Sequence, residues 1–432
     1  MIKIFLIMIA TVFSAKSAQP LEFAIGAQHH AAMPLVVGVF GKNQDKIEKL
    51  VLQLIKDLEF SKQFKIKLVK IKDEILKKET LQGFAKNNVP LALFINATSG
   101  QLSQFEWRLY DLLDLKMLMG KKVTYKGESD QAAHSVASKV WQQLMGADDC
   151  FNSVIVACKK FKENNKNYQH IYAFHPTKGA EGKIALVTAN TVNFAPRWHP
   201  NRRLLYYSQQ TLKNVRLMSI DEYGRKSIVT NFEGLNLTPA ISKNGQILVS
   251  LSSGGCEKLY RYDFDAAHKL NKFTALTDCR MHALSPSFID EERVVFCAID
   301  AEHKIPRIVI LNIPQHTATF LTGRGFCVSP TYSAQKNKIA YCKRVNGVQQ
   351  IFCYDLKHQD HEQLTKSAGN KDDCSWSPCG NYIIFTEDYG KTSRIALWSM
   401  LDATVTYLTP KGESWCFPAW SPCYDENLFI RC

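Results

Sequence analysis

The chain has 432 residues, of which 46% are hydrophobic and 22% are charged, and this balance is that of a soluble globular protein. The length exceeds that of one ordinary domain, so two domains are expected. The formal net charge of +14 is compatible with an acidic partner, with a nucleic acid, or with lysines that coat solvated faces. Because the lysines form no dense run interleaved with aromatic residues, the solvated surface is favoured and no nucleic acid is expected as a partner.

The first 18 residues have the pattern of a secretory signal that is removed on export. Lys3 supplies a short positive start, residues 4–13 are apolar, and small residues at 14–18 supply a cleavage site. The apolar run is too short to span a bilayer, and no later run approaches the length of a transmembrane helix. No cysteine follows the run, so a lipid anchor is not expected. The sequence therefore predicts an exported protein without a membrane span.

Residues 19–33 form a short segment ahead of the first domain, and residues 21–30 alternate in polarity as an extended strand does. Such a piece either pairs as an edge strand or hangs free. Two adjacent histidines, His29 and His30, raise the question of a metal site. Neighbouring side chains of an extended chain point to opposite sides, so no metal is expected here.

Residues 34–150 are predicted to fold as an α/β domain. Apolar residues recur at helical spacing in 45–58 and 130–145, whereas 34–40 is an apolar run typical of a buried strand. Gly146 is a fitting stop for the last helix. The predicted order is strand 34–40, helix 45–58, strand 64–69, helix 75–84, strand 90–95, strands 101–111 and 115–125, and helix 130–145.

Residues 151–432 contain a signature of the form Pro-x-aromatic-Ser-Pro in six copies, some of them degenerate. The copies begin 43 to 47 residues apart, a period typical of the blades of a β-propeller. Short apolar strands separated by polar turns follow the signatures. The predicted fold of this part is all-β, with six blades, and Cys374 replaces the leading proline of the fifth signature. The aromatic residues of the signature are expected between blades, and the proline before each aromatic suits the start of a strand. The residues of this structural motif are Pro196, Trp198, Pro239, Pro286, Phe288, Pro330, Tyr332, Trp376, Pro378, Pro418, Trp420 and Pro422.

The two ends of the repeat region are incomplete in complementary ways. The last signature, at Pro418, is followed by a single apolar run, whereas residues 151–174 contain two strand-like runs that no signature precedes. The simplest arrangement is ring closure, in which the strands of 151–174 complete the blade that the last signature begins. Closure removes the exposed sheet edges that an open array would have.

The chain contains 13 cysteines, and none forms the Cys-x-x-Cys pattern of a zinc site. Cys297, Cys342 and Cys353 stand inside predicted strands, as small hydrophobic residues do. An exported protein permits disulfides, and an odd count leaves at least one thiol free. The favoured disulfides are the pairs that flank signature turns, Cys374 with Cys379 and Cys416 with Cys423.

Motifs of the common enzyme classes are not found in the sequence. It has no Gly-x-Ser-x-Gly elbow, no Walker loop, no His-Glu-x-x-His and no Gly-x-Gly-x-x-Gly. His199, His282 and Asp372 lie near repeat loops, where single polar residues are typical of turns and channels rather than of catalysis. No catalytic residue, cofactor or metal is therefore expected.

The repeated Pro-x-Trp-Ser-Pro, the Leu-Thr that closes the repeats, the α/β order before them and the signal-like start together resemble TolB, the periplasmic propeller family of the Tol–Pal envelope system. The resemblance covers nearly the whole mature chain. It implies a TolB-like propeller of WD40 type and a non-enzymatic adaptor that supports outer-membrane integrity and constriction during cell division. The alternative is a propeller-containing hydrolase, related to peptidases, or a ligand-binding propeller.

The resemblance also implies protein partners. A short extended N-terminus of TolB proteins binds the membrane-anchored TolA, while the propeller binds Pal, the peptidoglycan-associated lipoprotein; other outer-membrane-associated proteins are further partners. The residues at the place that matches the TolA-binding segment are Glu22, Phe23, Ala24, Ile25 and Gly26. We further hypothesise that this segment alternates between packing on the body and binding TolA.

Loops just before the signatures are expected to converge at one mouth of the propeller channel, where propellers usually bind ligands. Arg324 and His282 suit acidic groups of a partner, and Trp415 suits an aromatic anchor. The alternative for each residue is an ordinary solvated loop. The expected Pal-binding rim consists of Asn193, Asn236, His282, Arg324, Lys371, Asp372 and Trp415.

Overall fold

We describe the protein from a computed structural model. The structure describes residues 32–73, 75–97, 104–124, 129–188, 191–237, 239–253, 255–265, 270–300, 302 and 304–424. The predicted signal and the predicted TolA-binding residues 22–26 lie outside these ranges. No helix within the described ranges is both long and apolar enough to cross a membrane.

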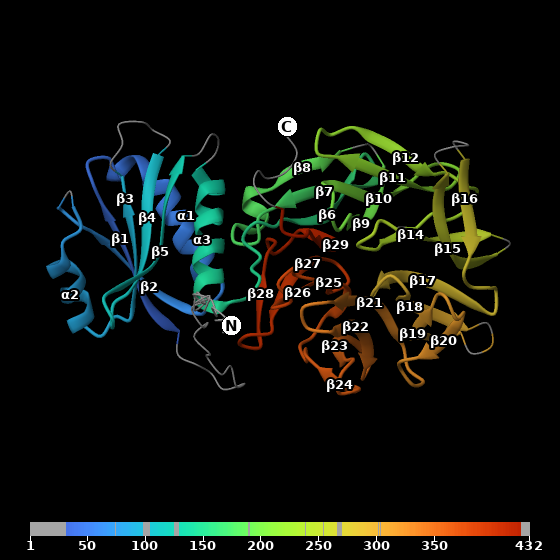
Figure 1. The fold of residues 1–432 in the computed structure, drawn as a ribbon. Helices are drawn as coiled ribbons and strands as arrows, with labels where there is room; N and C mark the ends of the chain where they lie inside the picture. Colours follow the sequence, from blue (N-terminus) through green and yellow to red (C-terminus); the bar gives the residue numbers. More distant parts are fainter. Residues whose placement is uncertain are drawn as a thin grey trace, which may run out of the picture.

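The N-terminal unit is a five-stranded sheet with helices on both faces (Figure 1). The sheet order is β2-β1-β3-β4-β5, in which β1 pairs in parallel with β2 and β3, while β4 and β5 are added antiparallel. The strands are β1 (Met33–Phe40), β2 (Phe64–Lys70), β3 (Leu91–Asn96), β4 (Gln104–Asp111) and β5 (Lys116–Thr124). The helices are the short η1 (Gln44–Ile47), α1 (Glu48–Phe60), α2 (Lys78–Lys86) and α3 (Ser129–Met145).

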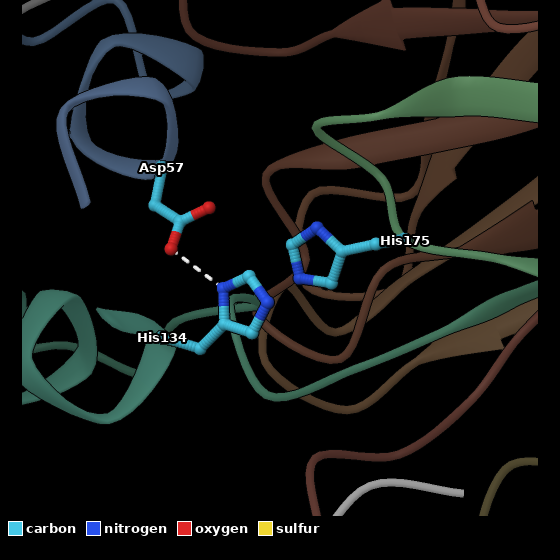
Figure 2. A group of neighbouring side chains, drawn as sticks. All are labelled: Asp57, His134 and His175. Carbon is cyan, nitrogen blue, oxygen red and sulfur yellow. Dashed lines mark hydrogen bonds and ion pairs between the residues drawn. The ribbon is translucent and has the colours of Figure 1, made fainter. Parts of the chain in front are cut away.

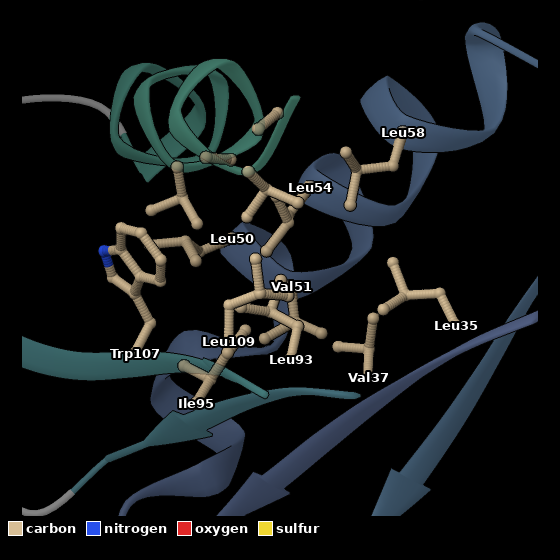
Figure 3. Packing of buried hydrophobic residues seen from close by; sticks show 14 of the residues in the cluster. Leu35, Val37, Leu50, Val51, Leu54, Leu58, Leu93, Ile95, Trp107 and Leu109 are labelled. Atoms are coloured by element: carbon tan, nitrogen blue, oxygen red, sulfur yellow. The ribbon is translucent and has the colours of Figure 1, made fainter. Parts of the chain in front are cut away.

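One face of this sheet is covered by α1 and α3, which bury the larger of its two cores (Figure 3). Leu50 and Leu54 of α1 are four residues apart, share one side of the helix and are fully buried. Strand β1 lies inside the sheet between β2 and β3 and is covered on both faces, which explains its uninterrupted apolar sequence. At Gly38 of β1 a Cβ atom would lie 2.5 Å from Phe94 Cδ1, so only glycine leaves room for that ring.

The rest of the described chain is a β-propeller. Four sheets of four antiparallel strands follow one another, and the first strands of most neighbouring sheets contact each other, as they do around a propeller axis (Figure 1). These sheets consist of β9 (Asn193–Trp198), β10 (Leu204–Gln210), β11 (Val215–Asp221) and β12 (Lys226–Thr230); β13 (Ala240–Ile241), β14 (Ile247–Ser253), β15 (Cys256–Asp265) and β16 (Leu270–Ala275); β17 (Met281–Phe288), β18 (Arg293–Asp300), β19 (Pro306–Asn312) and β20 (Thr317–Phe320); and β21 (Cys327–Ser333), β22 (Lys338–Val345), β23 (Val348–Asp355) and β24 (Asp360–Gln363).

An eight-stranded sheet contains both ends of the propeller. Its strands are β25 (Asn370–Trp376), β26 (Tyr382–Asp388), β27 (Ser393–Ser399), β28 (Thr404–Tyr407), β29 (Ser414–Trp420), β6 (Ile155–Glu163), β7 (Lys166–Phe174) and β8 (Ile184–Val187), with the short helix η2 (Gly179–Gly182) between β7 and β8. Strand β29 pairs antiparallel with β6, so that Cys416 lies opposite Cys158 and Trp420 lies opposite Ile155. This pairing confirms the predicted ring closure.

The signature tryptophans connect neighbouring sheets. Trp198, Trp376 and Trp420 are buried, with 9%, 7% and 6% of their surface exposed. Trp198 Nε1 donates to Ala419 O at 3.3 Å, and Trp376 Nε1 donates to Thr331 O at 3.2 Å. The indoles of Trp198 and Trp376 therefore reach the first strand of the neighbouring sheet, whereas Trp420 Nε1 donates to Ser153 Oγ at 2.8 Å, just before β6.

A β-bulge bends the first strand of most sheets just before the signature. The register shifts at this point in β9, β17, β21, β25 and β29. A non-glycine residue with a φ between 50° and 55° stands at each bulge, a conformation that L-residues adopt rarely. The residues are Ala195, Ser285, Ser329, Asp373 and Phe417, each directly before the leading position of its signature.

Candidate functional site

Two polar regions at opposite ends of the propeller strands are candidates for function. The first joins the N-terminal unit to the propeller and is centred on Asp57 of α1, His134 of α3 and His175, which follows β7; we call these three residues the interdomain cluster (Figure 2). All three are buried. His134 Nδ1 lies 2.6 Å from Asp57 Oδ2, and the two imidazole rings stack with centroids 3.9 Å apart and planes inclined by 13°.

The hydrogen bonds around the cluster define the state of His175. Its Nε2 lies 2.8 Å from Phe151 O, which only accepts, and its Nδ1 accepts from the backbone N–H of Thr177 at 3.3 Å. This arrangement satisfies a neutral imidazole with its proton on Nε2. Burial, and then the neighbouring His134, lower the pKa of His175 to about 3. The ring therefore stays neutral at physiological pH.

Two imidazoles and one carboxylate, whose ligand atoms all lie within 4.8 Å of one another, form a donor set known from metal centres. The remaining contacts favour another role. Asp57 Oδ1 already accepts from Gln53 Nε2 at 2.7 Å and from Thr177 Oγ1 at 3.2 Å. The lone pairs of an imidazole lie in the plane of its ring, so two nearly parallel stacked rings do not direct them to one point. The interdomain cluster is therefore best described as a closed hydrogen-bond network.

Further polar contacts reinforce the same junction. Lys178 donates to Asp130 Oδ2, which connects the segment after β7 to the start of α3. Lys62, just after α1, lies 2.8 Å from Asp402 Oδ2 in the turn before β28. The N-terminal unit thus contacts the connections after β7 and β27, which lie at one end of the propeller strands.

Sequence reasoning did not single out the interdomain cluster. His134 and Asp57 lie on the faces of α3 and α1 that carry the apolar residues, and His175 follows a strand in another part of the chain. A charged or titratable residue on an apolar helix face was the available signal, because such a group requires a buried partner.

The second region is the other end of the propeller, where the first strands begin and the hairpins between second and third strands turn; we call it the propeller mouth. Of the residues predicted for the Pal-binding rim, Asn193, His282, Lys371, Asp372 and Trp415 lie within first strands rather than in loops. Asn236 and Arg324 lie in connections. The sequence therefore placed these residues at one end of the propeller, but it assigned most of them to loops although they lie in strands.

Four of these residues are fully buried: Asn193, Asn236, Lys371 and Trp415. Lys371 Nζ lies 3.2 Å from Glu387 Oε1 and donates to backbone carbonyls. Trp415 Nε1 donates to Glu413 Oε2 at 2.7 Å, and its ring packs against Tyr172. A buried indole cannot be the surface anchor expected from the sequence, because in a strand the direction of a side chain depends on the pleat rather than on its distance from a loop.

The two asparagines are structural as well. Asn193 accepts from Gln209 Nε2 at 2.8 Å and donates to Gln169 O at 3.1 Å, which connects β7, β9 and β10 at the mouth. Asn236 Nδ2 donates to Val215 O at 2.7 Å, next to β11. His282, Asp372 and Arg324 remain at least partly exposed, and Arg324 is the most accessible of the predicted set.

A basic hollow of about 590 Å³ opens at the mouth between the β6–β7 and β26–β27 hairpins. Lys160, Lys162 and Lys391 line it, with Asp388 as an acidic neighbour. All three lysines are exposed, and none of them forms an ion pair with another described residue. The sequence showed them only as scattered lysines, because the fold brings residues 160–162 next to residue 391.

Comparison with known proteins connects this architecture to a family. The profile of the TolB beta propeller domain matches residues 270–431. A protein TolB homolog from Chlorobium luteolum is 26% identical over 245 residues, which are 55% of this chain and 52% of that protein. The Tol-Pal system protein TolB of Pseudomonas syringae pv. syringae is 29% identical over 153 residues, or 34% of each chain. The resemblance to TolB is confirmed.

The match to these curated TolB relatives spans about half of their length or less. The crystal structure of TolB from Acinetobacter baumannii matches more broadly, over 90% of this chain and 97% of that one, with a TM-score of 0.73 and 19% identity. At this identity the structural match shows the TolB-like fold and nothing of partners.

In this TolB-like chain the predicted disulfides are wrong. The disulfide among the described residues joins Cys256 to Cys279. Cys374 Sγ lies 3.4 Å from Cys342 Sγ in a neighbouring sheet, and not beside Cys379. Closeness in sequence did not predict the pairing because β25 presents Cys374 between two sheets, whereas Cys379 belongs to the turn after the strand.

The second predicted pair is separated in the same way. Cys416 lies in β29 with its Sγ 3.8 Å from Cys158 O, and Cys423 Sγ donates to Asp149 O at 3.2 Å. Cys297, Cys342 and Cys353 are buried inside strands, as the sequence predicted for small hydrophobic residues.

Proposed function

We propose that the chain is a non-enzymatic adaptor of the Tol–Pal type, exported to the periplasm, which binds Pal at its propeller mouth and TolA through its N-terminus. The observation that carries the proposal is the agreement of a TolB propeller profile over 270–431 with a TolB-like fold along most of the chain. The system named in the relatives supplies the partners. In this proposal the protein supports outer-membrane integrity and constriction during cell division.

The proposed organisation is a signal peptide at 1–18, a TolA-binding segment at 19–33, an α/β domain at 34–150 and a six-bladed propeller at 151–432. We count the eight-stranded sheet as two blades, because one register pair, Ser393 with Ser414, joins its halves. Each half then has four strands, like the other blades. The α/β assignment of the first domain is supported by its mixed sheet covered by helices.

The Pal-binding surface is assigned to the propeller mouth because the N-terminal unit occupies the other end of the propeller strands. At the mouth, Arg324 is exposed, His282 is half-buried with its Nδ1 2.5 Å from Glu257 Oε2, and Lys160 and Lys162 add positive charge around the basic hollow. Such a surface fits acidic groups of a protein partner. The buried rim residues, Asn193 among them, hold this surface in shape.

A binding titration tests the proposal. Purified Pal from the same source is titrated into the mature chain and into a variant that combines Lys160→Glu, Lys162→Glu and Arg324→Ala. Reversal of charge at the mouth is expected to weaken binding by at least about tenfold and to reduce its salt dependence. The control is Lys226→Glu, an equally exposed lysine on the outer strand β12.

Unchanged affinity of the mouth variant would place the Pal site elsewhere, and absence of binding by the unaltered chain would contradict the adaptor role. A chain lacking residues 19–30 tests the TolA site in the same way. That chain is expected to lose TolA binding, and a change in its Pal affinity would reveal coupling between the two sites.

A further inference from the structure

Two of the buried cysteines have sulfur atoms that lie close together. Cys342 of β22 and Cys374 of β25 are both buried, and their Sγ atoms lie 3.4 Å apart. The two strands belong to neighbouring sheets, and both thiols lie in one apolar cluster with Ile351 and Trp376. A thiol is a weak hydrogen-bond donor, so a hydrogen bond between the two thiols does not by itself explain why they lie so close together in an apolar cluster.

We propose that Cys342 and Cys374 are a modification site, at which an inter-blade disulfide forms when the protein folds under oxidising conditions. The sulfur atoms need to approach by about 1.4 Å to reach a bond length of about 2.05 Å, a movement that small rotations of two side chains can share. The bond connects a middle strand of one blade to the innermost strand of the next.

The disulfide between Cys256 and Cys279 provides a precedent within the same chain. Cys256 begins the third strand of its sheet, and Cys279 lies two residues before the first strand of the following sheet. Cys342 and Cys374 also connect neighbouring blades, two blades later, although Cys342 is in a second strand and Cys374 lies within a first strand. Their separation of 32 residues is similar to the 23 residues of the first bond.

The reaction is thiol–disulfide exchange with a disulfide oxidant. The thiolate of one cysteine attacks a sulfur of the oxidant and forms a mixed disulfide. The second cysteine then displaces the oxidant as its dithiol, or as two thiols. One S–S bond is broken and one is formed, and the two protons of the cysteines end on the reduced oxidant or in water.

Burial determines when this exchange takes place. Burial raises the pKa of the Cys342 thiol well above its ordinary range, and both sulfur atoms are shielded from an oxidant in the folded chain. The bond therefore forms before the two blades finish packing, while both thiols are still accessible. Once buried, it is protected from small reductants in the same way.

Peptide mapping tests the proposal directly. The mature chain is refolded with reduced and oxidised glutathione, denatured, alkylated without reduction and digested. We expect a cross-linked peptide that contains Cys342 and Cys374, next to the peptide that joins Cys256 to Cys279. The latter serves as the internal standard for oxidation. Recovery of Cys342 and Cys374 as separately alkylated peptides, in a sample that contains the standard, would overturn the proposal.

A matched pair of cysteines controls for mere closeness. Cys158 and Cys416 face each other across β6 and β29 and are equally buried, and Cys416 Sγ donates to the backbone oxygen of Cys158 at 3.8 Å. Both are expected to be alkylated in full. If they are cross-linked as extensively as Cys342 and Cys374, oxidation in this chain is unspecific and the site has no special status.

A stability measurement gives an independent readout. In a background with Cys256→Ser and Cys279→Ser, the chain refolded with a reductant is expected to have a Tm several degrees lower than the chain refolded oxidatively, because the reductant then prevents the second bond before burial protects it. Adding Cys342→Ala and Cys374→Ala should abolish this response. A Tm that is insensitive to the reductant in the first background contradicts the proposal, and the peptide map of the unaltered chain does not depend on how these variants fold.

Discussion

His175 shows how one buried side chain makes a domain junction sensitive to acid. The imidazole is held neutral between a carbonyl acceptor at Phe151 and a backbone donor at Thr177. The groups that face it are His134, whose ring is stacked on it, Asp57 and Lys178. In the unfolded chain the same imidazole takes up a proton near pH 6.5. Between the two pKa values, folding therefore requires the His175 side chain to lose the proton that it carries in the unfolded chain.

This difference predicts a loss of stability in acid. Because the pKa of folded His175 is lowered to about 3, its contribution is complete above about pH 6.5 and is lost as the pH falls towards 3. The slope is at most about 1.4 kcal/mol per pH unit. The variant His175→Gln has no proton to gain, so its free energy of unfolding should fall less steeply between pH 6.5 and 4.

Denaturant unfolding at a series of pH values measures the difference between the two chains. His316→Gln, a change at an exposed histidine, is the control and should follow the unaltered protein. If the free energy of unfolding of His175→Gln and of the unaltered protein changed with pH in the same way, burial at the junction would not restrict the protonation of His175.

At the level of elements, the first strands of the blades share a strained feature. The bulge residue of β9, Ala195, has a φ of 50°, and its counterparts in four other first strands have nearly the same value. Each such non-glycine residue costs roughly 1–2 kcal/mol in backbone strain. The repetition indicates that the bend is needed for the packing of the innermost strands, and that it recurs whichever side chain the position carries.

Relief of this strain is measurable. Ala195→Gly removes the steric conflict of a Cβ atom at positive φ and is expected to stabilise the protein by a few tenths to about 1 kcal/mol, because the gain in backbone fit exceeds the entropic cost of glycine. Ala318→Gly in the exposed outer strand β20, which has no such φ, should destabilise by about 0.5–1 kcal/mol. Chemical denaturation compares the two; equal destabilisation of both would mean that Ala195 carries no strain.

At the scale of the molecule, the sequence predicted the features that repeat and failed on those that depend on distant neighbours. The propeller follows from the period of the signature, and its closure follows from the unmatched strands of 151–174, which β6 and β7 confirm. The contact of Cys374 with Cys342 and the burial of Lys371 depend on which side of a strand faces the next sheet. When both faces of a sheet are covered by neighbouring blades, the spacing of residues along the strand does not show which face a given side chain is on.

The same reasoning explains why the interdomain cluster was missed. His134 and His175 come from two structural units, and each is a single polar residue in its own element. Their relation exists only after the N-terminal unit has docked on the propeller. The basic hollow is similar, since Lys160 and Lys391 are brought together by the ring and not by a motif.

Ring closure predicts that the start of the propeller is indispensable. Deleting residues 151–175 removes β6 and β7 and leaves β29 without its partner strand. We expect the shortened protein to be insoluble, or to lose cooperative unfolding, because a long innermost edge is exposed. Deleting residues 19–30 serves as the control and should leave a soluble chain. Cooperative unfolding of the first variant would show that the ring is stable while open.

The pairing of β6 with β29 also determines the order of events when the chain is made. Cys158 and its partner across the sheet are 258 residues apart, so at a synthesis rate of about 5–20 residues per second the first strand is finished roughly 13–50 s before the last. During that interval β6 presents an apolar edge with no partner in the nascent polypeptide. A holding factor, or export before folding, would protect this edge of β6. The slowest step of folding is expected to be the pairing of residues 414–420 with β6 once they have been synthesised, rather than the formation of any single blade.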